Sequence, residues 1–345
     1  MISINLIVRD GEKYIRQCLD AVLAQSCQDF ELIIFDNDST DRTKEIINSY
    51  HLSPITYNLI ENPVNLGPWG GFEESLKYSH SEFVVLLSVD VILDKDFIKN
   101  ALAVMEQDEK IGALQAKVKQ WCFSADGQPE KTDLIDTLGF KIFRNRRLIN
   151  IGQGEEDRGQ YDQEKEIFGV EGAVPVFRRE ALEDCRLPRG STSGEGEIVD
   201  HDMFWYGDDL DLVWRMRLFG WKQVYVPSVI AWHDRSTTKD TKQKWYDYFF
   251  RVGRRRQIPI RKRRLDWRNY RLAIIKNDYM INILRDWPRI AAREIMVLGY
   301  AILFEPQIFL EIPTFLKLLP KTLNKRKKIM LKAKIGPKEI RQWFH

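Results

Sequence analysis

The sequence predicts an α/β fold: a mostly parallel central sheet with helices on both faces, followed by a helical, basic region. Two observations lead to this prediction. Over the first hundred residues, short apolar runs alternate with amphipathic helical patterns, and alternating β and α elements of this length are joined by right-handed crossovers that build a parallel sheet. After residue 240 the sequence becomes helical, aromatic and basic. We therefore expect one domain at residues 1–240 and a second region at residues 241–345.

The strands and helices of the first domain are predicted in chain order. Four apolar runs predict strands, and the second and fourth are too apolar to lie at a sheet edge: 3–8, 30–35, 55–60 and 83–87. Amphipathic patterns predict helices between them, at 12–25, 41–50 and 72–79. Beyond Ile111 the pattern loosens into mixed strand and loop. The Gly- and Ser-rich stretch 189–197 is either disordered or a mobile cover over a site.

Charge is divided unevenly along the chain. The formal net charge is only +3, but residues 1–240 carry −15 and residues 241–345 carry +18, so the two parts face different partners. The four cysteines show no metal-ligand spacing and no secretory signal precedes Ile2, which predicts reduced packing residues in a cytosolic protein. No stretch reaches the roughly 18 to 20 apolar residues of a spanning helix. The nearest run, Ile295–Phe304, is flanked by charges and suits a helix lying at an interface.

The densest acidic cluster comprises Asp208, Asp209 and Asp211. Like charges packed this closely raise one another's pKa, so the cluster is a candidate site for acid/base chemistry. The alternative is a solvated helix N-terminus, where acidic residues complement the macrodipole. His233 follows a long apolar run. A lone histidine in that setting is more often structural than a ligand.

Polar residues directly follow the expected strand at 30–35. Asp36, Asn37 and Asp38 stand where an α/β sheet meets a nucleotide base or ribose. The alternative is a helix cap, since Ser39 or Thr40 can cap the next helix. Both interpretations can hold together.

Two further segments are candidates for binding a diphosphate. Asn65, Gly67 and Gly71 form a glycine-rich turn before a helix, which would let backbone N–H groups approach a phosphate. Its spacing fits neither the dinucleotide fingerprint nor the P-loop, so a plain turn is an equal alternative. Ser88 and Asp90 end the last apolar strand. A carboxylate there is costly unless it is solvated or bound, for example to a metal ion on pyrophosphate oxygens.

Together these segments resemble family 2 glycosyltransferases, in the order of the motifs as much as in their residues. The resemblance covers roughly residues 1–240 and rests on five loose motifs: Phe35–Asp41, Asn65–Gly67 with Gly70–Gly71, Ser88–Asp90, Gly172–Ala173 with Arg178–Leu182, and Gly207–Leu212. It implies a GT-A fold that binds a nucleotide-sugar. It also implies transfer of the sugar with inversion at its anomeric carbon.

The resemblance also implies roles for individual residues. Asp36 and Asn37 would contact the base and ribose, and Asp90 would be the last acid of the DxD motif that holds a divalent cation, Mg²⁺ or Mn²⁺, on the diphosphate. His233 is similar to a histidine that supplies a further metal ligand in some members. Asp209 matches the general base, which removes the acceptor hydroxyl proton while the cation stabilises the departing diphosphate.

The chain departs from the family pattern at two positions. Ser88 stands where many relatives have the first Asp of DxD, which lowers the expected metal affinity or makes the metal dispensable. Asp208 replaces the more usual Glu before the base, and the sequence leaves open an exchange of roles between Asp208 and Asp209. Asp211 is expected to face the other way and to pair with Arg215 at i+4.

The basic C-terminal region predicts a membrane surface as partner. Apolar helical segments at 290–304 and 308–319 alternate with basic clusters, which is typical of a monotopic protein on an anionic leaflet. The alternative is that these helices simply pack on the catalytic domain. Rhamnosyltransferase-like members of the family have a similar C-terminus and use polyprenyl-diphosphate-linked acceptors. This resemblance implies dTDP-rhamnose as donor, a lipid-linked saccharide of a cell-surface polysaccharide as acceptor, and a location at the cytoplasmic membrane face.

Two other functions compete with this interpretation. A nucleotidyltransferase acting on sugar phosphates would use the same sheet, but it usually needs a basic, glycine-rich N-terminal phosphate loop, of which Val8–Gly11 is a poor version. A non-catalytic nucleic-acid-binding protein would use the basic region and bind with steep salt dependence. It would leave Asp208 and Asp209 unexplained, so we expect no nucleic-acid partner.

Overall fold

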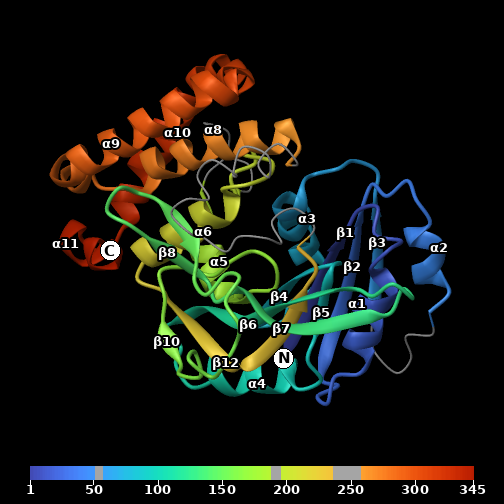
Figure 1. The fold of residues 1–345 in the computed structure, drawn as a ribbon. Coiled ribbons are helices and arrows are strands. Elements are labelled where there is room, and N and C mark those ends of the chain that lie inside the picture. The colour runs from blue at the N-terminus through green and yellow to red at the C-terminus, as the bar shows by residue number, and fades with distance from the viewer. Residues whose placement is uncertain (51–56, 188–195, 236–257) are drawn as a thin grey trace.

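The computed structural model describes residues 1–50, 57–187, 196–235 and 258–345 (Figure 1). Within these residues, ten strands form one sheet: β1 (Ile2–Val8), β2 (Phe30–Asn37), β3 (Tyr57–Asn62), β4 (Phe83–Ser88), β5 (Val91–Leu93), β6 (Ile111–Phe123), β7 (Pro129–Thr137), β10 (Lys165–Glu166), β11 (Val176–Arg178) and β12 (Lys222–His233). The main path runs β10-β12-β6-β11-β4-β1-β2-β3, while β5 pairs with β12 and β7 with β6. A separate hairpin joins β8 (Phe140–Ile142) to β9 (Leu148–Asn150).

The N-terminal part of the sheet confirms the predicted parallel arrangement. β1 lies between β2 and β4, β2 pairs with β3, and all three pairings are parallel. β2 and β4 are internal strands, as their apolar sequences predict. The strand expected at 55–60 is found as β3, and residues 51–56 lie outside the described part. Helices α1 (Ile15–Leu23), α2 (Thr43–Asn48) and α3 (Pro68–Ser75) connect these strands.

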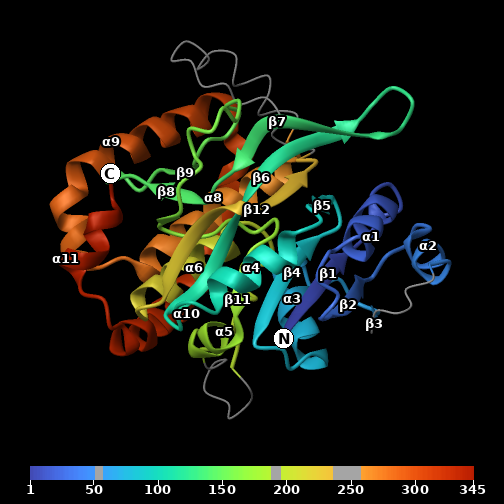
Figure 2. The same ribbon diagram turned by 90° about the horizontal axis from the view of Figure 1, so that it is seen from below.

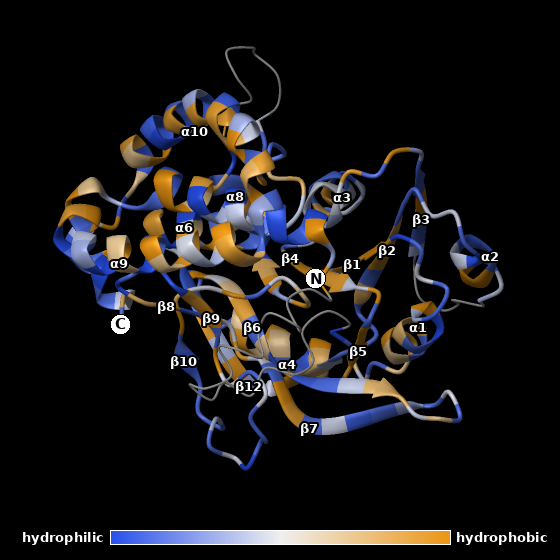
Figure 3. Ribbon diagram, turned by 45° about the horizontal axis from the view of Figure 1, so that its top comes forward, coloured by the Kyte–Doolittle hydropathy of each residue, from blue (hydrophilic) through white to orange (hydrophobic). Residues whose placement is uncertain are grey.

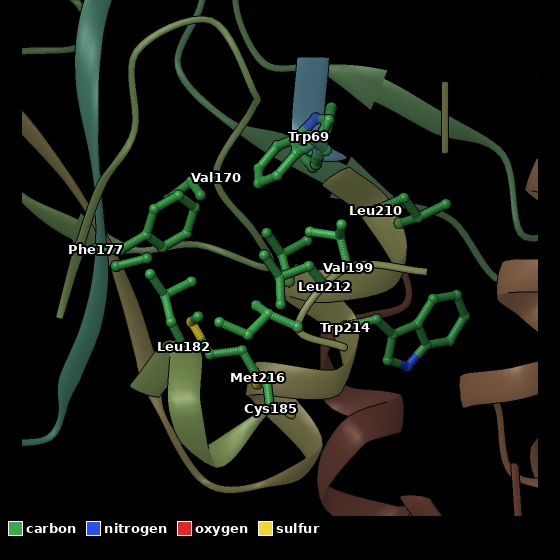
Figure 4. Close-up of a cluster of buried hydrophobic side chains, with 14 of the residues drawn as sticks. Trp69, Val170, Phe177, Leu182, Cys185, Val199, Leu210, Leu212, Trp214 and Met216 are labelled. Carbon is green, nitrogen blue, oxygen red and sulfur yellow. The ribbon is translucent and has the colours of Figure 1, made fainter. Parts of the chain in front are cut away.

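Helices cover both faces of the sheet, because successive strand residues point to opposite sides. In β4, Val84 and Leu86 join a core with α3, α5 (Arg179–Asp184) and α6 (Asp208–Leu218). Val85 and Leu87 join a second core with α1, α2 and α4 (Phe97–Met105). Figure 4 shows side chains of the first core, including Trp69, Phe177 and Trp214.

The second half of the sheet is mixed. β11 runs antiparallel to both β4 and β6, whereas β12 runs parallel to β6 and antiparallel to β5. The long β6–β7 hairpin extends beyond the rest of the sheet (Figure 2). The β5–β12 pairing sets His233 opposite Val91, one residue after Asp90. This register brings two distant sequence motifs to the same edge.

The C-terminal region is helical, as predicted. It contains α8 (Ile260–Asn277), α9 (Met280–Phe304), a 3₁₀ helix at Pro306–Glu311, α10 (Ile312–Lys332) and α11 (Pro337–Ile340). These helices gather at the end of the molecule away from β1–β3 (Figures 1 and 2). α8 packs on both α6 and α10. The domain boundary expected near residue 240 and most of the Gly- and Ser-rich stretch at 189–197 lie outside the described residues.

Buried ion pairs join α8 and α10 to the first domain. Lys276 Nζ lies 2.8 Å from Asp211 Oδ2 and also contacts Asp200. Lys325 Nζ lies 2.6 Å from Asp200 Oδ1. Burial alone raises the pKa of Asp200, but the two lysines outweigh it and hold this pKa below its usual range. The helices α8 and α10 therefore pack on the first domain at these positions, which was the alternative to a membrane surface for this region.

No single helix among those described has the length and apolar composition needed to cross a membrane, which agrees with the sequence. Residues 280–304 and 306–332 pass that test only as a pair, bent by 111° at the break between them.

Candidate active site

The structure brings together the two residues predicted to ligate a metal. Asp90 follows β4 and is partly exposed, and His233 ends β12. His233 Nε2 lies 3.3 Å from Asp90 Oδ2. Two hydrogen bonds to the backbone oxygen of Asp90 hold this arrangement in place. Asp234 N–H donates to Asp90 O at 3.0 Å, and the indole Nε1–H of Trp121 donates to the same oxygen at 2.9 Å.

A second carboxylate orients the histidine. His233 Nδ1 lies 2.9 Å from Oδ2 of Asp136, a fully buried residue of β7. Burial lowers the pKa of His233, but the carboxylates of Asp90 and Asp136 outweigh this effect and raise it to about 10.

Asp90 and His233 fit a divalent cation. Two ligand atoms at right angles on an octahedral ion, each about 2.1 Å from it, lie about 3 Å apart, close to the observed Asp90–His233 separation. Asp136 supplies the carboxylate that metal-binding histidines typically bond through their other nitrogen. The described residues contain no group of three or more His, Cys, Asp or Glu side chains able to hold an ion. A cation here therefore needs ligands from a bound molecule or water.

Asp208 and Asp209 are the first two residues of α6. The acidic cluster therefore lies at a helix N-terminus, as one of the two interpretations of the sequence predicted. Gly207 caps the helix with a φ of 82°, and Asp209 Oδ1 accepts the Leu210 N–H at 2.7 Å. Asp211 faces away and bonds Arg215 at 2.7 Å, which confirms the predicted i,i+4 pair. Asp208 is 4% exposed, whereas Asp209 is partly exposed.

The two adjacent carboxyl groups have different environments. Burial first, and then the charge of Asp209, raise the pKa of Asp208 well above its usual range. Burial and the carboxylate of Glu171 raise the pKa of Asp209 to about 7. Asp208 is thus enclosed, in surroundings that favour its neutral form. Asp209 is accessible and titrates near neutral pH, which suits a general base.

A chain of charged side chains connects the Asp90–His233 pair to Asp209. Arg235 lies 2.8 Å from Asp136 Oδ1 and 2.7 Å from Glu171 Oε1. The charges of Glu171 and Arg235 both affect the pKa of Asp209: the Glu171 carboxylate raises it and the Arg235 guanidinium lowers it. The loop that carries Glu171 also touches the end of β4, because Ser88 N–H donates to Ala173 O at 3.2 Å. The Asp90–His233 pair is thus linked through Asp136 and Arg235 to Glu171, whose charge helps raise the pKa of Asp209.

The predicted nucleotide-binding residues lie at the carboxyl end of β2. Asp36 is buried and accepts the Ser39 N–H at 3.0 Å. Asn37 is also buried, and its amide ties β2 to the next loop by donating to Gly67 O at 2.9 Å and accepting the Leu66 N–H at 2.9 Å. Asp38 is partly exposed with a φ of 72°. Contacts of Asp36, Asn37 and Asp38 with a nucleotide stay a prediction.

The glycine-rich segment differs from the expected turn. α3 begins at Pro68, so Gly71 lies inside the helix, and Gly67 caps it with a φ of 77°. A Cβ on Gly71 would come within 3.2 Å of Asn37 Nδ2, so this glycine lets α3 pack closely against β2. The N–H of Gly67 donates to Asn65 Oδ1 at 2.8 Å, and that of Gly71 donates to Gly67 O at 2.9 Å. In this conformation neither N–H is free to bind a phosphate. The glycines are instead needed for the positive φ of Gly67 and for the close packing of α3 at Gly71.

Three residues of the site were not found from the sequence: Asp136, Glu171 and Arg235. Asp136 has no charged neighbour in the chain, Glu171 directly precedes the Gly172–Ala173 motif, and Arg235 follows Asp234. Asp136 is buried next to the apolar Ile135, a weak signal of charge pairing, since charged side chains are rarely buried without a partner. The ion-pair partners of Arg235 lie 64 and 99 positions away in the chain, at Glu171 and Asp136. Sequence spacing alone does not reveal pairings at that distance.

Comparisons with known proteins identify the family of this chain. The model of the family "Glycosyl transferase family 2" matches residues 3–185. The poly-beta-1,6-N-acetyl-D-glucosamine synthase of Staphylococcus epidermidis is 23% identical over 231 residues, covering 67% of this chain and 49% of the relative. The chain thus spans about half the length of the curated relatives it matches first.

Two solved structures share the fold. TarS 1–349 of S. aureus in complex with UDP has a TM-score of 0.51 at 14% identity, covering 99% of this chain and 83% of that one. GalNAc-T7 with UDP, GalNAc and Mn²⁺ has a TM-score of 0.54 at 12% identity, covering 80% and 48%. These likenesses confirm a GT-A fold with a C-terminal helical region. With its family model matched over more than half of its length, this chain belongs to glycosyl transferase family 2.

Proposed function

We propose that this protein is an inverting glycosyltransferase that moves a sugar from a nucleotide-sugar to an acceptor hydroxyl. The observation that carries this proposal is a line of charged side chains: the Asp90–His233 pair, suited to a diphosphate-bound cation, is linked through Asp136 and Arg235 to Glu171, whose charge helps raise the pKa of Asp209 to about 7. Family membership supports the reaction class over the nucleotidyltransferase and nucleic-acid alternatives.

In this mechanism Asp209 accepts the proton of the acceptor hydroxyl as its oxygen attacks the anomeric carbon. Asp208 Oδ1 accepts the Asp209 N–H at 3.2 Å, which fixes the helix start that carries the base. Glu171 keeps the proton affinity of Asp209 high enough to take the proton at neutral pH. A cation bound by Asp90 and His233 would neutralise charge on the departing nucleoside diphosphate.

Of the two predicted cations, the donor set favours Mn²⁺. Mg²⁺ prefers an all-oxygen shell, whereas His233 offers a nitrogen. GalNAc-T7 was crystallised with Mn²⁺. We expect His233→Ala to raise the Mn²⁺ concentration needed for half-maximal activity by roughly ten- to a hundredfold, as loss of a metal-site residue typically does. A metal titration of initial rates measures this, and an unchanged titration would return His233 to a purely structural role.

The pH dependence of the reaction follows from Asp209. The base must be deprotonated, so kcat/KM should rise with pH and level off above the Asp209 pKa of about 7. Because the Glu171 carboxylate raises that pKa, Glu171→Gln should move the acid limb of the profile to lower pH. Rates measured from pH 5 to 9 for both proteins test this expectation. An acid limb at the same pH in both would remove Glu171 as a determinant of the base.

The proposed donor is dTDP-rhamnose and the proposed acceptor is a lipid-linked saccharide used in cell-surface polysaccharide synthesis. The first support is the resemblance to rhamnosyltransferase-like members in the helical, basic C-terminus. The second is that the relatives that match include a polysaccharide synthase. UDP-sugars are the strongest competing donors, since the TarS and GalNAc-T7 structures both contain UDP.

A donor panel tests the proposed function directly. Hydrolysis of dTDP-rhamnose, UDP-glucose, UDP-N-acetylglucosamine and GDP-mannose is measured with Mn²⁺, with Mg²⁺ and with chelator. We expect one donor to be turned over fastest and its turnover to depend on the cation. No release of nucleoside diphosphate from any sugar donor, together with exchange of pyrophosphate into a nucleoside triphosphate, would favour the nucleotidyltransferase alternative.

We further propose that α9 and the start of α10 rest on the cytoplasmic face of an anionic membrane. Many large apolar side chains of this hairpin are exposed, among them Leu284, Trp287, Ile295, Leu298, Ile302, Leu303, Leu310 and Leu316. Along α9 several of them recur at helical spacing on one stripe. Figure 3 shows apolar and hydrophilic residues alternating along α10. An exposed apolar stripe of this length indicates an apolar partner, such as the acyl layer of a membrane.

The charge of the same hairpin fits an anionic partner. Its four acidic residues point inward: Asp286, Glu305 and Glu311 are buried, and Glu294 pairs with Arg271. Its exposed charged residues are all basic, namely Arg285, Arg289, Lys317, Lys321, Lys327 and Lys332. Each basic residue near an anionic bilayer contributes about 1 kcal/mol of binding.

Point substitutions test the membrane proposal better than deletion of the region, because Lys276 and Lys325 hold buried ion pairs with the first domain. Leu298→Glu with Ile302→Glu should lower binding to vesicles of anionic lipid by at least about tenfold, since burying a charge in the apolar layer costs several kcal/mol. Flotation of the protein with such vesicles measures this. Tyr57→Glu, at another exposed position in β3, is the control. Equal flotation of all three proteins would contradict the proposal.

A further inference from the structure

An exposed aromatic pair stands directly before the candidate base. The indole of Trp205 is 39% exposed. It stacks on the ring of Tyr206, with 4.6 Å between centroids and 29° between planes. Two large rings held together at the surface present a flat apolar face to solvent, an arrangement that often marks a binding surface.

The backbone around this pair is strained. Phe204 and Tyr206 have φ angles of 65° and 66°, a region that bulky L residues avoid at a cost of about 1 to 3 kcal/mol each. The buried amide of Asn269 in α8 holds the strained segment. Its Nδ2 donates to the carbonyl oxygens of Met203, Trp205 and Tyr206 at 2.8, 2.9 and 2.7 Å.

Cations also brace the segment from α8. Arg261 lies over the ring of Phe204 at 5.2 Å, and Lys262 lies over the ring of Tyr206 at 4.3 Å. A costly backbone conformation persists only where the surroundings enforce it, and such conformations cluster at functional sites. The structure here enforces a conformation that exposes Trp205.

The pair lies on the base side of the site. Trp205 is four residues before Asp209, and Gly207, which caps α6, is the residue after Tyr206. The phenol of Tyr206 is close enough to Asp208 and Asp209 for their charges to add to burial in raising its pKa. A ring stacked on this pair would therefore sit beside the carboxyl that accepts the acceptor proton.

We propose that Trp205 and Tyr206 form a stacking platform for the pyranose ring of the acceptor saccharide, a role that rests on the proposed glycosyl transfer. One face of a pyranose consists of C–H groups, which pack on the electron-rich face of an aromatic ring. Stacking leaves the hydroxyl groups at the ring edge free. One of them can then reach Asp209, while the donor diphosphate binds beside Asp90.

Saturation-transfer NMR tests the platform without a known acceptor. Methyl glycosides of glucose, galactose, N-acetylglucosamine and rhamnose serve as probes, each added to the full chain with UDP and Mn²⁺. We expect the ring protons of at least one glycoside to receive saturation from the wild-type protein. Trp205→Ala should weaken that glycoside's affinity by about tenfold, the size expected for loss of one good aromatic contact.

Two variants and one nucleotide measurement control the experiment. Trp205→Phe keeps a flat ring and should retain most of the saturation signal. Trp287→Ala removes another exposed tryptophan, on α9, and should leave the signal unchanged. The affinity for UDP, measured by calorimetry, should be the same in all four proteins. Unchanged UDP binding also shows that Trp205→Ala is folded.

Each other outcome overturns the proposal. Saturation of no glycoside by the wild type, or an equal signal in Trp205→Ala, would mean that the pair binds no pyranose. A loss of UDP affinity in Trp205→Ala with an unchanged glycoside signal would assign the pair to the nucleobase instead. Failure of glycosyl transfer itself is seen separately, as absence of donor hydrolysis in the wild type.

Discussion

Asp209→Asn is expected to lower the rate of sugar transfer by about a thousandfold, within the range that general-base catalysis contributes. The amide has nearly the shape of the carboxylate but cannot take the acceptor proton. Binding of the nucleoside diphosphate should survive, because the Asp90–His233 pair that would hold it is unchanged. Initial rates with the donor identified by the panel, together with calorimetric titration of UDP, measure the two effects.

Asp208→Asn is the matched control for this variant. Asp208 is enclosed, and its pKa is raised well above the usual range by burial and by the adjacent Asp209. The neutral amide matches the carboxyl in size, and the surroundings of Asp208 already favour a neutral group, so transfer should fall far less than in Asp209→Asn. The opposite ranking of the two variants would exchange the roles of Asp208 and Asp209, the alternative that the sequence left open.

Lys276→Met is expected to lower the free energy of unfolding by about 3 to 5 kcal/mol, the usual cost of removing one partner from a buried ion pair. Lys276 is fully buried and contacts both Asp200 and Asp211. Methionine fills a similar volume but leaves two buried carboxylates with less positive charge beside them. Urea denaturation followed by tryptophan fluorescence measures the change.

Lys321→Met is the matched control, because it makes the same substitution at a surface lysine. Lys321 is 63% exposed and lies 3.2 Å from Asp202. Exposed pairs of this kind contribute 0 to about 1 kcal/mol. A loss of less than about 1 kcal/mol in Lys276→Met would mean that α8 is not anchored to the first domain through this residue. The C-terminal helices would then form a more independent unit than their contacts indicate.

The first half of the fold was predictable because its signals are local. Apolar runs and helical periodicity placed β1, β2, β4 and the helices between them within a few residues. The start of α3 was misplaced, since Gly70 and Gly71 look like a turn in sequence and are used for close packing in the structure. β11 and β12 were not assigned, because their pairing depends on contacts between residues far apart in the chain.

The site shows the same division. Asp90, His233 and the acidic pair at 208–209 stand in short motifs, and their positions were predicted from the chain. Asp136, Glu171 and Arg235 were not singled out in the sequence and are recognised only because the fold brings them together. Asp208 and Asp209 have the same chemistry, so the sequence leaves the choice of base open, and the structure adds that the two residues differ in exposure.

The central claim is that a diphosphate-bound cation and the proton-accepting acid share one site. Anomalous diffraction from crystals grown with Mn²⁺ and a nucleoside diphosphate tests it most directly. We predict a manganese peak within coordination distance of Asp90 Oδ2 and His233 Nε2, with the diphosphate on the side that faces Asp209. A nucleotide and manganese bound elsewhere on the molecule, with Asp90 and His233 still in direct contact, would contradict the claim.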